Sequence, residues 1–600
     1  MATAQTIESQ DISLGKLFSD FHVVPDYQRE FVWETGQVEQ LLEDIHTEFS
    51  STDGSANSEY FIGSIVVCPR PDGVFELIDG QQRMTTAYLF LCAVRDHLEE
   101  QGEAPIDQLG HLIAASDIDA EGNDIYRYRV DLQYEDSGDI LETVARGSAS
   151  LEQHTDATRS IANMKNAYGV IRVFLQREFG DDVNAVRRFY SFFSKNVKLI
   201  RIRTQSVAHA LKIFETINDR GLGLDSMDLL KNLMFMQAKQ SDFERLKTRW
   251  KRLVDTLYRA GEKPLRFLRY FILATYDVDR LREDAIYSWF VGSESQCGYQ
   301  SDPIAFVDGL VDAAQAYSHF LGGRDAWGNR NRYLENIRYL SGSARQHLIL
   351  LLASRKLPPD AFSELCRDVE NLFFAYIITR EATREFERKF TQWARELRRV
   401  SDQQGLAEFR RRRFEPARRE LTQRFDLAFR GLDAAAIQKY RMRYLLGKLT
   451  QYVNEQAYGS EGAEASLETF VNSKVHVEHI LPQTATDEVL AEFDEPSLAE
   501  ECIQRLGNLT LVEQPLNTSL GNKPFSQKKD VYTHSKFLLT SGISQKVVIG
   551  ANTAVDRAVR EIEPFNTWDS TAIEMRQMML GQLARRVWEM PNPGQGQTDP

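Results

Sequence analysis

Residues 475–483 read VHVEHILPQ, and residues 506–512 downstream read LGNLTLV. The first stretch alternates apolar and polar residues, which predicts a short strand. The second predicts another strand that begins after Gly507. A helix is expected near Pro524, because proline is tolerated in a first helical turn. This end of the chain is therefore predicted to be two strands joined by a loop and followed by a helix.

Four polar side chains occupy this predicted unit: Glu478 and His479 at the end of the first strand, Asn508 at the start of the second, and Asn517 nine positions later. A carboxylate and an asparagine carbonyl are hard oxygen ligands for a divalent metal such as Mg²⁺ or Mn²⁺. A neutral imidazole beside that metal can deprotonate a water, and the metal can neutralise charge on a phosphodiester. The alternative interpretation is two ordinary surface histidines and two turn asparagines.

The order of these residues resembles the HNH, or His-Me finger, nucleases. The resemblance implies that His479 is the general base, that Glu478 and Asn517 bind the metal, and that Asn508 holds the loop bearing the histidine. Many HNH enzymes carry Asp at the position of Glu478. In the family the following helix completes the finger, which implies DNA contacts by Lys523, Lys528 and Lys529.

Composition limits the classes of protein that this chain can belong to. Its 600 residues are too many for one core, and 42% hydrophobic with 26% charged residues is typical of soluble globular domains. No run approaches the ~20 apolar residues of a membrane span, and the N-terminus does not resemble a signal peptide. The 5 scattered cysteines predict a reducing, cytoplasmic location without disulfides or a zinc site. A net charge of −15 argues against non-specific coating of nucleic acid.

The N-terminal part predicts alternating strands and helices. A helix is expected from Thr35 to about Phe49, a strand over residues 60–68, a return strand over 74–78 and a helix over 84–98. The acidic segment 99–142 is interpreted as an insertion or long loop around a possible strand at 125–132. Helices are expected over about 155–200, then a short strand at 198–203.

The sequence DGQQR at residues 79–83 lies where the return strand meets its helix. Free backbone N–H groups and the positive end of the helix dipole face a ligand there. Gly80 allows close approach, Arg83 offers a planar fork for phosphate oxygens, and Asp79 can hold a metal or a ribose hydroxyl. The alternative is a plain strand–turn–helix junction with a solvated arginine.

Three further blocks accompany DGQQR: YQR at 27–29, FIGSI at 61–65 and IFETINDRGL at 213–222. Together they resemble the ParB-like nucleotide-binding domain of GmrSD-type modification-dependent restriction enzymes. The resemblance implies a site for a nucleoside triphosphate (ATP, GTP or CTP), formed by Gln28, Arg29, Asp79, Gly80, Gln81, Gln82, Arg83, Asn218 and Arg220. The sequence has no GxxxxGK[ST] motif, so a P-loop is not expected.

Residues 229 to about 450 are predicted to be mostly helical. Within them Arg410, Arg411, Arg412 and Arg413 form a run just before the predicted nuclease. Such a run is either a solvated helix face or a track for DNA phosphates. Residues 380–430 hold 15 basic and 9 acidic side chains, whereas residues 99–142 hold 13 acidic and 2 basic ones. DNA is therefore expected to meet the later part of the chain.

The combined expectation is an α+β multidomain protein that resembles a single-chain GmrSD-, BrxU- or SspE-type enzyme. Its expected parts are a ParB-like α/β domain (10–235), a helical middle (236–420), a ββα-metal nuclease domain (421–560) and a closing helix with a disordered tail (561–600). The resemblance implies a type IV restriction endonuclease that cuts modified double-stranded DNA under nucleotide control. A homodimer is expected as the element that the nucleotide switches, because dimerisation offers two discrete states. The alternative is a nucleotide-switched DNA-binding or toxin-like module whose HNH domain is idle or acts on RNA.

Overall fold

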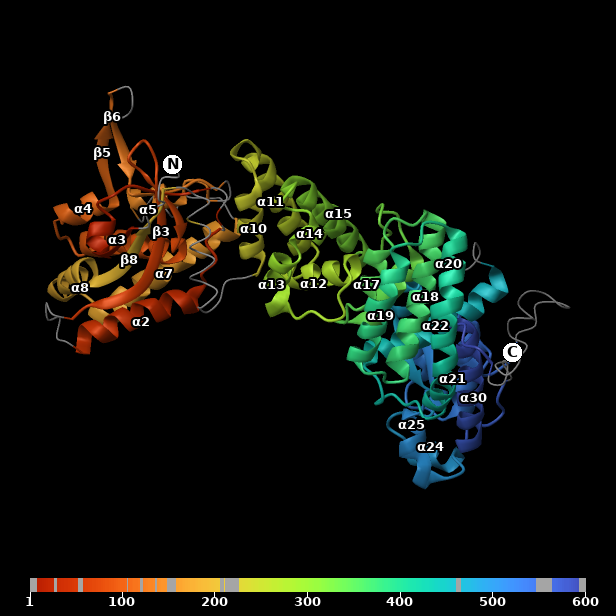
Figure 1. Cartoon of the computed structure of the whole chain (residues 1–600). Helices are drawn as coiled ribbons and strands as arrows, with labels where there is room; N and C mark the ends of the chain where they lie inside the picture. The colour runs from red at the N-terminus through yellow and green to blue at the C-terminus, as the bar shows by residue number, and fades with distance from the viewer. Residues whose placement is uncertain are drawn as a thin grey trace. The chain divides into compact units, whose positions relative to one another are not determined.

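The computed structural model describes residues 8–25, 28, 30–51, 58–104, 106–118, 122–134, 137–147, 158–205, 210, 226–459, 466–546 and 564–592. The chain forms two compact units (Figure 1). Unit 1 contains residues 1–250 and 290–307, and unit 2 contains residues 251–289 and 308–600. The divisions fall within α11 (Phe243–Arg259), α13 (Ile286–Gly292) and α15 (Pro303–Leu321).

Unit 1 combines strands and helices in alternation. Its elements are β1 (Glu8–Ser13), α1 (Leu14–Leu17), β2 (His22–Val24), α2 (Thr35–Ser51), β3 (Tyr60–Pro69), β4 (Phe75–Asp79), α3 (Gln81–Glu100), α4 (Asp107–Ile113), β5 (Ala114–Ile118), β6 (Asp124–Tyr128), β7 (Val130–Leu132), α5 (Ile140–Arg146), α7 (Arg159–Phe179), α8 (Val183–Lys195), β8 (Val197–Arg203), α10 (Ser226–Gln237), a 3₁₀ turn at Gln240–Asp242 and α14 (Glu294–Cys297).

The main sheet of unit 1 has six strands in the order β1-β8-β3-β4-β2-β7. β1 and β8 are antiparallel, as are β3 and β4, whereas β3–β8, β2–β4 and β2–β7 are parallel. Helices α2, α3, α7 and α8 pack together, and their apolar faces share one core with the sheet. The structure confirms the predicted α2, α3, β3, β4 and β8. Their observed ends differ from the predicted ends by at most three residues.

The acidic segment 99–142 is more ordered than the sequence analysis expected. The single strand expected at 125–132 is wrong: the chain forms β6 and β7 and changes sheets at Arg129. β6 pairs with β5 in a separate two-stranded sheet that projects in Figure 1, whereas β7 joins the main sheet beside β2. Apolar residues on α4 and α5 lie in the common core, so this segment is part of the domain rather than an inserted loop.

Unit 2 is mostly helical, as predicted. Its elements are α12 (Pro264–Thr275), a 3₁₀ turn at Glu283–Ala285, α16 (Arg332–Ser341), α17 (His347–Ala353), α18 (Pro359–Ile378), α19 (Thr383–Leu397), α20 (Gln403–Phe409), a π-helical turn at Arg410–Phe414, α21 (Glu415–Arg430), α22 (Lys439–Tyr458), α23 (Glu468–Val471), β9 (Val475–His479), α24 (Asp487–Glu492), a 3₁₀ turn at Pro496–Leu498, α25 (Ala499–Gln504), a 3₁₀ turn at Leu506–Asn508, β10 (Leu509–Glu513), α26 (Gln514–Leu520), α27 (Phe525–Tyr532), α28 (Leu538–Ser541) and α30 (Ser570–Val587).

The C-terminal finger is defined here as residues 475–532; it contains the antiparallel strands β9 and β10, helices α24 and α25 between them, and helices α26 and α27 after them. β9 and β10 pair with Leu509 opposite His479 and Thr510 opposite Glu478. α27 begins one residue after Pro524, as predicted. α26 was not predicted; it begins directly after β10, carries Pro515 in its first turn and packs against β9, β10 and α27. The expected α+β multidomain class is confirmed.

Among the helices that the structure describes, none has the length and apolar character needed to cross a membrane.

Candidate functional site

His479 is the last residue of β9, and its imidazole is half-buried. The side-chain nitrogen of Gln483 lies 3.2 Å from Nε2 of His479, within hydrogen-bond distance. Burial, with the nearby Lys528 ammonium as a second cause, lowers the pKa of His479 to about 4. The imidazole is therefore neutral at physiological pH, the state that a proton-accepting base needs.

Glu478 points from β9 into the interior of the finger. Its Oε1 accepts hydrogen bonds from Lys528 Nζ at 2.6 Å and from the Tyr532 hydroxyl at 3.1 Å. Lys528 also donates to the carbonyls of His479 and Ile480, at 2.9 and 3.2 Å. Each of the three ammonium protons thus has an acceptor, which favours the charged form of the lysine. Burial raises the pKa of Glu478 and lowers that of Lys528, and each charge opposes the shift in the other.

The predicted DNA contact of Lys528 does not fit this geometry. Its side chain is 0% exposed and is held by Glu478 and two main-chain carbonyls. A lysine in that environment holds β9 against α27 instead of meeting a phosphate. Lys529 is half-buried, and Lys523 is exposed with its ammonium donating to the Ser519 carbonyl at 2.9 Å. These two residues remain available to DNA.

Asn508 is fully buried and holds the chain that follows His479. Its Oδ1 accepts from the Leu481 N–H at 2.7 Å, and its Nδ2 donates to the Leu481 carbonyl at 2.9 Å. Nδ2 also donates to the Ile503 carbonyl at 3.0 Å. The Asn508 carbonyl accepts from the Ile480 N–H at 3.0 Å. Asn508 thus fixes two successive residues after His479 without touching the imidazole.

Asn517 lies on α26 and is half-buried, and α26 packs against both β9 and β10. Within the described ranges, no cluster of three or more His, Cys, Asp or Glu side chains forms a metal cage. A metal held here would therefore rely on few protein ligands. Mg²⁺ suits such a site because it retains waters and binds one or two carboxylates together with substrate phosphates.

At the N-terminal motif, Gly80 and Gln82 serve the fold of unit 1. Gly80 caps α3 with a φ of 89°, and a Cβ there would lie 2.5 Å from a methyl carbon of Ile65. Gln82 is buried; its Oε1 accepts from the N–H groups of Val32 and Trp33 at 2.9 and 3.1 Å. Its Nε2 donates to the Glu30 carbonyl at 3.0 Å. All the amide atoms of Gln82 are thus engaged in holding one segment against α3.

Arg83 also has a structural partner. Its Nη1 donates to the Ile62 carbonyl at 2.7 Å, and its Nη2 donates to the Ser64 carbonyl at 2.9 Å. The guanidinium therefore bridges two carbonyls of β3. Gln28 differs: it is buried, and its Nε2 has no hydrogen-bond partner among the described residues, while its main-chain carbonyl accepts from Lys231 Nζ at 3.2 Å. Lys231 was not among the predicted site residues.

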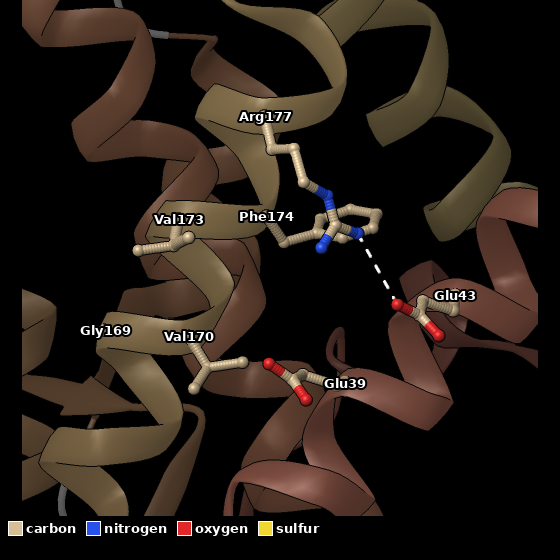
Figure 2. A pocket seen from close by; sticks show the side chains of 7 residues that line it. All are labelled: Glu39, Glu43, Gly169, Val170, Val173, Phe174 and Arg177. Atoms are coloured by element: carbon tan, nitrogen blue, oxygen red, sulfur yellow. Dashed lines mark ion pairs between the residues drawn. The ribbon is translucent and has the colours of Figure 1, made fainter.

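Asp79 ends β4, and Gln81 is buried at the start of α3. Arg29, Asn218 and Arg220 lie outside the described residues. A separate groove of about 320 Å³ runs between α2 and α7. Figure 2 shows Val170 and Val173 beside it and Arg177 reaching toward Glu43, at 3.6 Å. None of the predicted nucleotide ligands lines this groove.

The arginine run forms the π-helical turn, and its members differ in their partners. Arg410 pairs with the buried Asp368 at 2.6 Å and with Glu364 at 3.2 Å. Arg413 pairs with Glu396. Arg411 and Arg412 are exposed, and Arg412 has only a loose pair with Glu408 at 3.7 Å. Of the four, Arg411 and Arg412 are the side chains that face solvent freely enough to reach a phosphate.

Comparison with known families assigns both ends of the chain. Residues 14–235 match the N-terminal domain of the GmrSD restriction endonuclease, and residues 421–583 match the C-terminal domain of the GmrSD restriction endonucleases. No curated protein matches the chain. The molecule is therefore a DNA endonuclease of the restriction class, with a role in defence against phage. It belongs to the GmrSD family of type IV restriction enzymes.

Several residues that complete the finger were not predicted. Gln483 bonds the His479 imidazole, Tyr532 bonds Glu478, and Trp568 donates to Asn508 Oδ1 at 2.9 Å. Gln483 is four positions after His479, so its proximity was a weak local signal. Tyr532 and Trp568 are 54 and 60 residues from their partners, and nothing in the local pattern indicates those contacts.

Proposed function

We propose that the finger hydrolyses DNA phosphodiester bonds with His479 as the general base, as in HNH nucleases. The observation that carries this proposal is the placement of His479: it ends β9, is half-buried, and has its ring within hydrogen-bond distance of Gln483. Burial also lowers the pKa of His479 to about 4, which favours the neutral imidazole. Asn508 fixes the chain beyond the imidazole, and Lys528 fixes the carbonyl of His479 itself. A base held in this way contributes typically ~10²–10⁴-fold to a rate.

Glu478 and Asn517 are the residues that we expect to hold Mg²⁺ or Mn²⁺. Lys528 and Tyr532 both bond Oε1 of Glu478, so the second carboxylate oxygen is the one that can face a metal. The metal, when bound, would neutralise charge that develops on the phosphodiester. Lys528 then has two effects on Glu478: it orients the carboxylate and it reduces the net negative charge that the metal meets.

We further propose that unit 1 binds a nucleoside triphosphate that controls cutting. Gln28, whose buried amide nitrogen lacks a partner among the described residues, supports this site, as does the position of Asp79 at the end of β4, beside the N-terminus of α3. Gln82 and Arg83 would act indirectly, by holding the walls. The nucleotide would act as a conformational ligand that favours one arrangement of a homodimer, with ~1–3 kcal/mol of coupling.

The five cysteines are all free, which suits a reducing cytoplasm where incoming DNA would be met. We expect the DNA substrate to carry a modification. Candidates are glucosylated hydroxymethylcytosine, hydroxymethylcytosine and phosphorothioate.

Matched phage genomes that differ only in their modification test the substrate class directly. Each genome is incubated with the full chain and Mg²⁺ or Mn²⁺, with and without ATP, GTP or CTP. Cutting of one modified genome and not its unmodified counterpart supports the proposal. Asn517→Ala should raise the metal concentration that gives half-maximal cutting, and Asp79→Ala should abolish the nucleotide response. Equal cutting of RNA, or none of any DNA, would favour the RNA-directed or idle alternative.

A further inference from the structure

Helix α30 packs directly on the turn that carries Asn508. Gly507 has no room for a side chain, because a Cβ there would lie 2.1 Å from the main-chain oxygen of Ile573. A backbone-to-backbone contact of this kind needs glycine on one side. The helix therefore forms one wall of the finger, although it follows β10 by about sixty residues.

Arg576 is 0% exposed at the centre of this contact. Its Nη1 donates to the carbonyls of Gly507 and Leu509, at 2.7 Å each, so it grips the chain on both sides of Asn508. Its Nε and Nη2 have no hydrogen-bond partner among the described residues, and burial lowers its pKa to about 10. A buried guanidinium without a carboxylate partner is costly for folding stability. Packing alone would be served better by an apolar residue.

Two neighbours of Arg576 hold the same turn. Gln577 accepts from the Gly507 N–H at 2.9 Å, and its amide donates to the carbonyls of Phe429, Arg430 and Leu432. Trp568 donates to Asn508 Oδ1, the oxygen that also accepts from the Leu481 N–H.

We propose that Arg576 is a positioning residue of the nuclease. Through Gly507 and Leu509 it sets the position of Asn508, and through Asn508 it sets the chain that follows His479. The inference rests on the proposed function of the finger, and it assigns α30 to the same catalytic assembly. Arg576 itself touches no substrate.

Three variants of the full-length chain test this role. Arg576→Met keeps an unbranched apolar stem and removes every donor. Arg576→Lys retains an ammonium that can reach both carbonyls. Trp568→Phe removes the indole N–H that bonds Asn508. The matched control is Arg585→Met on the same helix, whose guanidinium pairs with Asp426 on α21 and has no bond to the finger.

Single-turnover cleavage should separate positioning from stability, when all variants are assayed below their melting temperatures. Arg576→Met should lower kcat roughly 10–100-fold with little change in KM for DNA, because a displacement of about 1 Å can cost 10² in rate. Arg576→Lys should recover most of that loss, and Trp568→Phe should lose less than Arg576→Met. Arg585→Met should keep kcat within about twofold of wild type.

Hydrogen exchange of a peptide containing Ile480 and Leu481 gives a readout that needs no activity. Its protection should fall in Arg576→Met and Trp568→Phe but not in Arg585→Met. Wild-type kcat and protection in Arg576→Met would overturn the proposal, as would equal losses in Arg585→Met. If the wild-type chain cut no DNA, the proposed function would fail, whereas the exchange data would still decide whether Arg576 positions this segment.

Discussion

The finger and the DGQQR junction are both strand-linked motifs, yet their polar residues are used differently. In the finger, Asn508 and Lys528 bond main-chain groups around His479, and neither of them bonds the imidazole. At the junction, Gln82 and Arg83 bond main-chain groups of other segments themselves. The difference shows that a motif can contain side chains that build a site as well as side chains that act in it.

This distinction predicts which substitutions affect chemistry and which affect stability. Removal of a side chain that bonds only main-chain groups should lower the free energy of unfolding, because buried N–H or C=O groups are left unpaired. A side chain that is presented to a ligand should cost activity or affinity instead. The four predictions below run from the largest expected effect to the smallest.

His479→Ala should reduce cleavage by about 10²–10⁴-fold, the usual effect of removing a general base. DNA affinity and melting temperature should change little, because the imidazole is only half-buried. His534→Ala, an exposed histidine two residues past α27, is the control and should cut normally. Plasmid cleavage and DNA binding measured on the same preparations give the answer. Normal cutting by His479→Ala would remove it from the base role.

Lys528→Met should destabilise unit 2 by about 3–5 kcal/mol, since it leaves the Glu478 carboxylate buried without its counter-charge. Cutting should fall as well, because the His479 and Ile480 carbonyls lose their donor. Lys529→Met, one residue on, should leave the melting temperature unchanged and affect DNA binding alone. Thermal unfolding of the two variants in parallel is the measurement. Equal melting temperatures would show that the Lys528 bonds contribute nothing.

Gln82→Met and Gln28→Ala should distinguish a side chain that stabilises the fold from one that binds the nucleotide. Gln82→Met leaves the Val32 and Trp33 N–H groups without an acceptor, which should cost about 1–3 kcal/mol of stability. Gln28→Ala removes an amide that has no Nε2 partner among the described residues, so stability should hold while nucleotide affinity falls. Calorimetric titration with nucleotide and thermal melting test both variants. Loss of stability in Gln28→Ala together with loss of nucleotide affinity in Gln82→Met would assign the structural role to Gln28 and the binding role to Gln82.

Local sequence patterns predicted much of this molecule, and long-range contacts account for what they missed. Apolar periodicity located α2, α3, β3 and β4, and the alternation of apolar and polar residues located the first strand of the finger, β9. Gln82 accepts a hydrogen bond from Val32, which lies 50 residues earlier in the sequence. Arg576 donates to the Gly507 carbonyl, which is 69 residues earlier. The DNA contact predicted for Lys528 came from the family resemblance, whereas the structure shows that Glu478 and two main-chain carbonyls at the end of β9 hold its ammonium.

The arginine run offers the same comparison on a smaller scale. Arg410 pairs with the buried Asp368, whereas Arg411 and Arg412 are exposed. Charge reversal of both, Arg411→Glu with Arg412→Glu, should lower the salt dependence of DNA binding by up to about 1.8 in slope, because each phosphate contact contributes about 0.9. The control is Arg280→Glu with Arg282→Glu, an exposed pair elsewhere in unit 2 that changes net charge equally. DNA affinity is measured across a series of salt concentrations for both double variants.

If the two slopes match that of wild type, the π-helical turn faces solvent away from DNA. If both fall equally, the effect is one of net charge and the run is not a specific phosphate track.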